Sequence, residues 1–207
     1  RVILEGFGSF ALDRNAFGAD VLVDIAPHDF DSPQPFTSDS YDLVASAESL
    51  GTVKDLPGAL IQMRALLAPG GLAMASFIGG ASLTNLRRAM LAAEPERPAA
   101  RMHPLVDPRS CTELLSRAGW ADPVVDSFAL KVRYGSLDRL VQDLREHAMT
   151  KVLATQSPPL TRDGVERARQ AFLALADEDG KVSETFEIVT LTGRALTGPT
   201  QVGSFRA

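Results

Sequence analysis

Two glycines and one acid near the start of the chain have the types and spacing of a nucleotide-binding site. Gly6 and Gly8 form a G-x-G bend directly after the apolar run 2–4. Glycine is needed where a ligand approaches the backbone closely, because any Cβ would block that approach. Asp24 lies at the end of a second apolar run, 19–25, and an acid at such a strand end accepts hydrogen bonds from ribose hydroxyls. The alternatives are an ordinary turn at the glycines, and a helix cap or a solvated strand end at Asp24.

The stretch 39–77 predicts the parallel strands that could hold such a site in place. The run 41–47 is strand-like, and Asp55 is placed to cap a following helix. Apolar residues at helical spacing predict one buried helix face, and the helix should end at the Pro-Gly-Gly turn 69–71. A second apolar run, 72–78, follows at once. A strand, a crossover helix and a strand of this size predict a right-handed βαβ unit.

The second half of the chain predicts more helices and two strands. Helices are expected after the cap candidate Ser82, over 108–117 after Asp107, over 137–147, and from Thr161 to about 176, and strands over 123–134 and 182–192. Apolar and polar residues alternate along the strand 123–134, as is typical of a strand at the edge of a sheet. Cys111 lacks a recognisable partner, so it is interpreted as a packing residue and not a nucleophile.

Composition limits the functional classes. The chain has 207 residues, 45% of them hydrophobic and 23% charged, with a formal net charge of −5. This charge gives no support for binding nucleic acid or anionic membranes. No apolar run approaches the roughly 20 residues of a membrane span. A single cysteine fits a reducing compartment, so a cytoplasmic location is expected. Because the chain starts with Arg1 and not Met, we also expect an upstream segment, which leaves the absence of a targeting signal uninformative.

One ordered set of motifs resembles a known superfamily. The motifs are F/Y-D-L-V at 41–44, D-L-P-x-A-L at 55–60, R-x-L at 64–66 and P-G-G-L at 69–72. Together they resemble class I S-adenosylmethionine-dependent methyltransferases. Within these, the chain is most similar to the group that holds the biotin-pathway malonyl-carrier-protein methyltransferase and the mitochondrial complex I assembly factor that modifies an arginine. The runs 132–137 and 185–188 extend the resemblance.

The resemblance implies a fold and a cofactor site. The expected fold is an α/β, Rossmann-like methyltransferase sheet, mostly parallel with an antiparallel last strand, and a C-terminal helical insertion. The chain 1–207 would form a single domain, in which 79–120 and 135–180 are helical insertions that form a cap. The resemblance also places eight residues against S-adenosylmethionine: Gly6, Phe7, Gly8, Asp24, Ile25, Asp31, Ser46 and Ala47. No catalytic residue and no metal ligand is assigned.

The chain also departs from the family pattern. Leu4 stands at the usual acidic position, Phe10 replaces the third glycine, and Gly51 and Thr52 replace a His-Trp pair. Together these changes predict weak cofactor binding or none. The expected function is methyl transfer to a small-molecule or protein acceptor. The alternatives are a non-catalytic, assembly-factor-like member that holds a protein partner, and a protein that modifies arginine. Whether the chain is an enzyme is left open.

Overall fold

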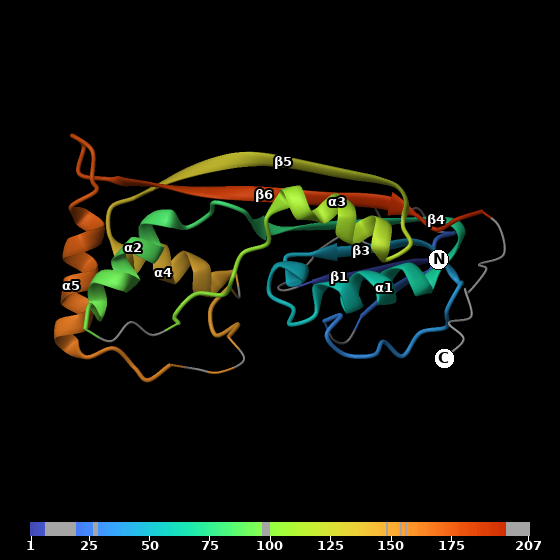
Figure 1. Cartoon of the computed structure of the whole chain (residues 1–207), viewed down its shortest axis with the longest axis horizontal. Helices are drawn as coiled ribbons and strands as arrows, with labels where there is room; N and C mark the ends of the chain where they lie inside the picture. Colours follow the sequence, from blue (N-terminus) through green and yellow to red (C-terminus); the bar gives the residue numbers. More distant parts are fainter. Residues whose placement is uncertain are drawn as a thin grey trace.

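The structure, a computed structural model, describes residues 1–6, 20–26, 29–96, 100–147, 149–153, 155 and 157–197. Within these residues the centre is a six-stranded mixed sheet (Figure 1). Its strands are β1 (Val2–Gly6), β2 (Val23–Ile25), β3 (Tyr41–Ala47), β4 (Leu67–Gly79), β5 (Ala121–Tyr134) and β6 (Val182–Arg194), in the order β2-β1-β3-β4-β6-β5. The first four strands are parallel neighbours, and β6 runs antiparallel to both β4 and β5. The predicted Rossmann-like sheet is therefore confirmed.

Five α-helices accompany the sheet in the described chain. They are α1 (Leu56–Leu66), α2 (Thr84–Ala93), α3 (Pro108–Arg117), α4 (Leu137–Glu146) and α5 (Arg162–Leu173), and a short 3₁₀ helix, η2 (Ser49–Gly51), follows β3. Three of the predicted caps are confirmed. The side chains of Asp55, Asp107 and Thr161 accept hydrogen bonds from backbone N–H groups in the first turns of α1, α3 and α5. These bonds satisfy donors that have no partner within a helix.

The cap predicted at Ser82 is wrong. The Ser82 hydroxyl instead donates to the Gly79 carbonyl and accepts from the Glu187 N–H. The N-cap position of α2 is Leu83, which has no side-chain oxygen and adopts a left-handed φ of 57°. Glu184, on the distant strand β6, takes the capping role because its carboxylate accepts from the Leu86 N–H at 2.8 Å.

The Pro-Gly-Gly turn also differs from its expected place. Helix α1 ends at Leu66, and 69–71 lies inside β4 and not between the helix and the strand. The cause is pairing with the end of β6. The Gly70 N–H donates to the Ala195 carbonyl, the Ala195 N–H donates to the Gly71 carbonyl, and Gly70 adopts a φ of 79°. Glycine tolerates that conformation without a Cβ clash.

Two hydrophobic cores share the sheet. The sheet core packs α1 and α3 against β1, β3 and β4, around residues such as Leu60, Phe77 and Leu115. The helical core joins α2, α4 and α5, around residues such as Leu140 and Phe172. Figure 1 shows β5 and β6 running as one long ribbon from the half of the molecule with α1 and α3 to the half with α2, α4 and α5. The ribbon thus connects the two halves.

Candidate active site

The ends of β1 and β3 meet where the G-x-G bend begins. Gly6 pairs with Ala47 in the sheet register. A Cβ built on Gly6 would lie 2.4 Å from the Ala47 carbonyl oxygen, closer than real Cβ contacts. Glycine at position 6 is therefore required by the strands themselves, whether or not a ligand binds there. Phe7 and Gly8, the next predicted cofactor residues, lie outside the described residues, as does Phe10.

A buried carboxylate stands directly before that glycine. Glu5 is only 7% exposed, and its Oε2 accepts hydrogen bonds from the hydroxyls of Ser46 and Ser49, each at 2.5 Å. Burial raises the pKa of the Glu5 carboxyl, and the two hydroxyls only partly oppose that shift. Among the described residues no cation forms an ion pair with it. A buried carboxylate with hydroxyl partners alone is the arrangement that a cationic ligand group would stabilise.

Glu5 is the site residue that sequence reasoning missed. The pattern of the resembled family directed attention to position 4, where this chain has leucine. The available signal was an acid next to the first glycine, at the end of the first strand. Ser46 was predicted to line the cofactor site, and the structure places its hydroxyl on Glu5.

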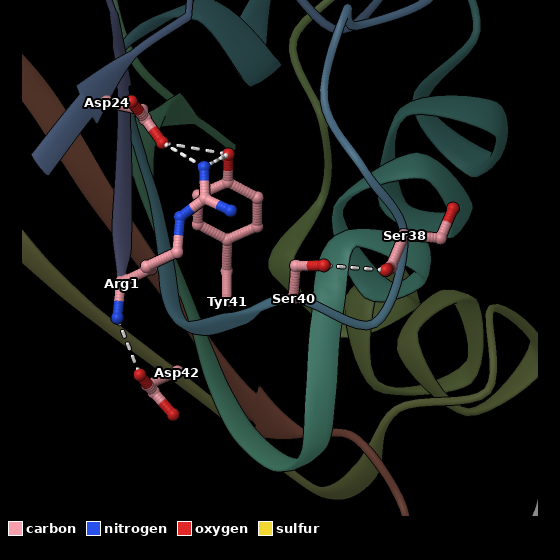
Figure 2. A network of polar contacts seen from close by, with 6 residues as sticks. All are labelled: Arg1, Asp24, Ser38, Ser40, Tyr41 and Asp42. Carbon is pink, nitrogen blue, oxygen red and sulfur yellow. Dashed lines mark hydrogen bonds and ion pairs between the residues drawn. The ribbon is translucent and has the colours of Figure 1, made fainter. Parts of the chain in front are cut away.

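Asp24 has partners on the side of the sheet away from the bend. It pairs with Ile3 in the register, three residues before Gly6. Figure 2 shows its carboxylate facing Arg1 and Tyr41. The Arg1 guanidinium lies 2.8 Å from Asp24 Oδ2, and the Tyr41 hydroxyl donates to the same oxygen at 2.9 Å. The hydrogen bond from Arg1 is the main reason why the pKa of Asp24 lies below its ordinary value. A ribose at Asp24 would have to exchange with these partners.

Two other predicted residues have local roles in the structure. Asp31 accepts hydrogen bonds from the Lys54 N–H, at 2.8 and 3.0 Å to its two oxygens, and from the Asp55 N–H at 3.2 Å. It thereby satisfies donors just ahead of helix α1. Ile25 is 56% exposed at the end of the edge strand β2. The register thus pairs Gly6 with Ala47 and Glu5 with Ser46 on one side of β1, and it pairs Asp24 with Ile3 and Ile25 with Leu4 on the other side.

A cavity of about 360 Å³ lies beyond the ends of β3 and β4. Its walls come from α2, α4 and the segments 100–105 and 149–153, and apolar side chains dominate them. They include Ile78, Leu83, Leu86, Met90, Val141 and Leu144. This size and lining suit a small molecule with an apolar body. Of the predicted cofactor residues that the structure describes, none lines the cavity, which instead includes the residue directly after Ala47, Glu48.

Glu48 connects the strand end to this cavity. It has a φ of 72° and a ψ of −37°, a conformation that costs a non-glycine residue about 1–3 kcal/mol. Its N–H donates to the Ser76 carbonyl at 2.6 Å, which ties the strained residue to β4. Burial raises the pKa of the Glu48 carboxyl, and the nearby charge of His147, just after α4, partly offsets the shift. Strain of this kind concentrates at functional sites.

Within the ranges that the structure describes, no group of three or more His, Cys, Asp or Glu side chains could hold a metal ion. In the same ranges, no helix combines the length and the apolar composition that crossing a membrane requires.

The amino-acid sequence of this chain is similar to a known protein family and to several named proteins. Residues 8–123 match a family model described as a methyltransferase domain. The mouse mitochondrial arginine-hydroxylase NDUFAF5 is 29% identical over 91% of this chain and 61% of its own length, and the human protein is 31% identical over 77% and 47%. The malonyl-[acyl-carrier protein] O-methyltransferase of Halorhodospira halophila is 30% identical over 75% of this chain and 52% of its length. The chain thus spans about half to three fifths of these relatives.

Solved structures support the fold alone. BH2331 of Bacillus halodurans superposes with a TM-score of 0.59 at 13% identity, over 95% of this chain and 92% of that one. The YcgJ protein of Bacillus subtilis gives 0.58 at 11% identity, with the same coverages. At such identities the likeness extends to architecture and not to a reaction.

Proposed function

The chain belongs to the class I S-adenosylmethionine-dependent methyltransferase family, and we propose that it transfers a methyl group to an acceptor bound in the cavity beyond β3 and β4. The observation that carries this proposal is the position of the cavity. It opens at the carboxyl ends of two parallel strands, next to the Gly6 and Ala47 pair. Ligands of open α/β sheets bind at these strand ends.

The residues at the bend fit the cofactor's charge. S-adenosylmethionine, when bound, supplies a methyl group that its sulfonium already activates, so the protein has mainly to bind and align the reactants. Glu5 is a buried carboxylate without a cationic partner in the described chain, and it would hold the cofactor's amino group. Asp24 remains our candidate for the ribose, provided that it releases Arg1 and Tyr41.

The acceptor side needs no acid–base pair of its own for this reaction. The acceptor atom forms a bond to the methyl carbon while the carbon–sulfur bond breaks, and the electron pair of that bond stays on sulfur. A proton lost from the acceptor passes to a base or to water. The mostly apolar walls of the cavity would hold the acceptor's apolar body and fix its orientation, which is the contribution that the reaction requires.

Calorimetric titration with S-adenosylmethionine tests the proposal. We expect saturable binding, and we expect Glu5→Gln to weaken it at least about tenfold, because the buried charge is lost while the hydroxyl partners remain. Asp24→Ala should also weaken it measurably if Asp24 binds the ribose. Glu113→Gln, an exposed change on α3, is the matched control and should leave the affinity unchanged. No heat at millimolar ligand would rule out the cofactor role.

A further inference from the structure

Glu48 lies between the strand end at Ala47 and the cavity. It directly follows Ala47, whose carbonyl touches the first glycine of the bend, and it is also part of the cavity wall. One residue therefore borders both the proposed cofactor side and the acceptor cavity. The neighbouring wall residues on β4, α2 and α4 are apolar, so they cannot distinguish one polar head group from another.

We infer that Glu48 selects the acceptor class: an apolar small molecule whose reacting group is a hydroxyl or an amine that donates a hydrogen bond to Glu48, and not a carboxylate. This inference rests on the proposed function and narrows it. A carboxylate acceptor would place a second negative charge beside Glu48 in a largely apolar cavity, where like charges repel strongly. A hydroxyl or amine instead supplies the donor that a half-buried carboxylate lacks.

The cations of the cavity do not reverse this preference. Arg101 forms an ion pair with Glu94, in which Nε donates to a carboxylate oxygen that also lies 2.7 Å from Nη2, so Glu94 offsets its charge. The buried Nη2 itself makes no hydrogen bond in the described chain. Lys151 is exposed, so water screens its charge, and the Nδ1 of His103, which also lines the cavity, lies 2.8 Å from the Pro104 carbonyl oxygen. His147 does not line the cavity and is exposed. Of the charged side chains that line the cavity, Glu48 is the one next to Ala47, the sheet partner of Gly6, and a backbone hydrogen bond ties its strained backbone to β4.

The methyl signals of the methionines can report directly on ligand binding in the cavity. Met90, Met102 and Met149 line the cavity, whereas Met63 is buried in the sheet core and Met74 is exposed on β4. In a spectrum of the protein labelled with ¹³C-methyl methionine, a ligand in the cavity should shift the first three signals and leave the other two in place. Three matched probes are 4-phenylbutan-1-ol, 4-phenylbutylamine and 4-phenylbutanoate, which share one apolar body.

We expect the alcohol and the amine to shift the three cavity signals at concentrations at least about tenfold below those needed for the carboxylate. Glu48→Gln keeps the size of the side chain and removes its charge, so this preference should fall to less than about threefold. Glu146→Gln, an exposed change on α4, is the matched control and should keep the full preference. Equal affinity for the three probes, an unchanged preference in Glu48→Gln, or no shift of the cavity methionines would overturn the inference.

The same sample separates this inference from the proposed function. Calorimetry with S-adenosylmethionine reports the cofactor side, and the probe titration needs no cofactor. Cofactor binding together with a carboxylate preference overturns the Glu48 inference and leaves the proposed function standing. The expected probe preference without cofactor binding overturns the proposed function and leaves Glu48 as the selecting residue of a binding cavity.

Discussion

Glu184 caps helix α2 from another strand, and its removal should destabilise the protein substantially. Its side chain is fully buried, and its carboxylate accepts from the N–H groups of Leu86, Asn85 and Thr185 at 2.8, 3.3 and 3.2 Å. The N-cap residue Leu83 provides no side-chain alternative. In Glu184→Ala the buried Leu86 N–H loses its partner, and water cannot replace it.

The expected loss of stability in Glu184→Ala follows from these contacts. A lost cap costs about 1 kcal/mol, and a buried donor left unsatisfied costs about 1–3 kcal/mol. We therefore expect Glu184→Ala to lower the free energy of unfolding by about 3 kcal/mol, which is about 6–12 °C in Tm for a domain of this size. Glu184→Gln keeps only one of the two acceptor oxygens and also loses the charge near the helix N-terminus, so its cost should be about 1–2 kcal/mol, less than that of Glu184→Ala.

Urea denaturation followed by circular dichroism measures these changes. Glu113→Ala on α3 is the control, because its ion pair with Arg117 is exposed and should contribute less than about 0.5 kcal/mol. If Glu184→Ala and Glu113→Ala destabilise the protein equally, the cap from β6 does not hold α2, and the reasoning is wrong. Because Leu86 and Met90 of α2 line the cavity, the same variant should also weaken probe binding there.

Two further predictions concern titratable groups. Burial raises the pKa of the Glu5 carboxyl above its ordinary 4.5, so its contribution to stability is present below that value and is lost as the pH rises through the folded-state pKa. Without cofactor, Glu5→Gln should therefore be more stable than the wild type at pH 7, and urea titrations should show this gain shrinking toward pH 4; a gain that is constant with pH would contradict it. Burial, followed by the nearby charge of Asp107, raises the pKa of the Cys111 thiol to about 11. At pH 8 a thiol reagent should react with the native protein at least about 100-fold more slowly than with the denatured one, and rapid native reaction would refute that burial.

Local signals in the sequence predicted much of the fold. The strand 41–47 and the helix 108–117 have the predicted bounds, and the caps at Asp55 and Asp107 formed as expected. Each depends on residues within one turn or one strand. The cap of α2 could not be found in this way, because Glu184 lies about 100 residues after the helix it caps.

The candidate site depends even more on contacts between residues far apart in the sequence, which local patterns do not show. The sequence predicted Gly6 and Ser46 as cofactor residues, but the hydrogen bond from Ser46 to Glu5 forms only because β1 and β3 pair. Asp31 had the right chemical type for a ligand contact, yet the start of α1 supplies N–H donors to it first. The cavity depends on α2, α4 and the segment 149–153 coming together, and no single pattern encodes that.

Strand β6 couples the unfolding of the two hydrophobic cores. Val189 and Leu191 belong to the sheet core, and Val182 and Phe186, a few residues earlier on the same strand, belong to the helical core. If either half unfolded, β6 would lose packing contacts, and the core of the other half also depends on this strand. The two cores should therefore unfold as one cooperative unit, and the cavity, which is lined mostly by residues of the helical core, should keep its shape until the whole molecule unfolds.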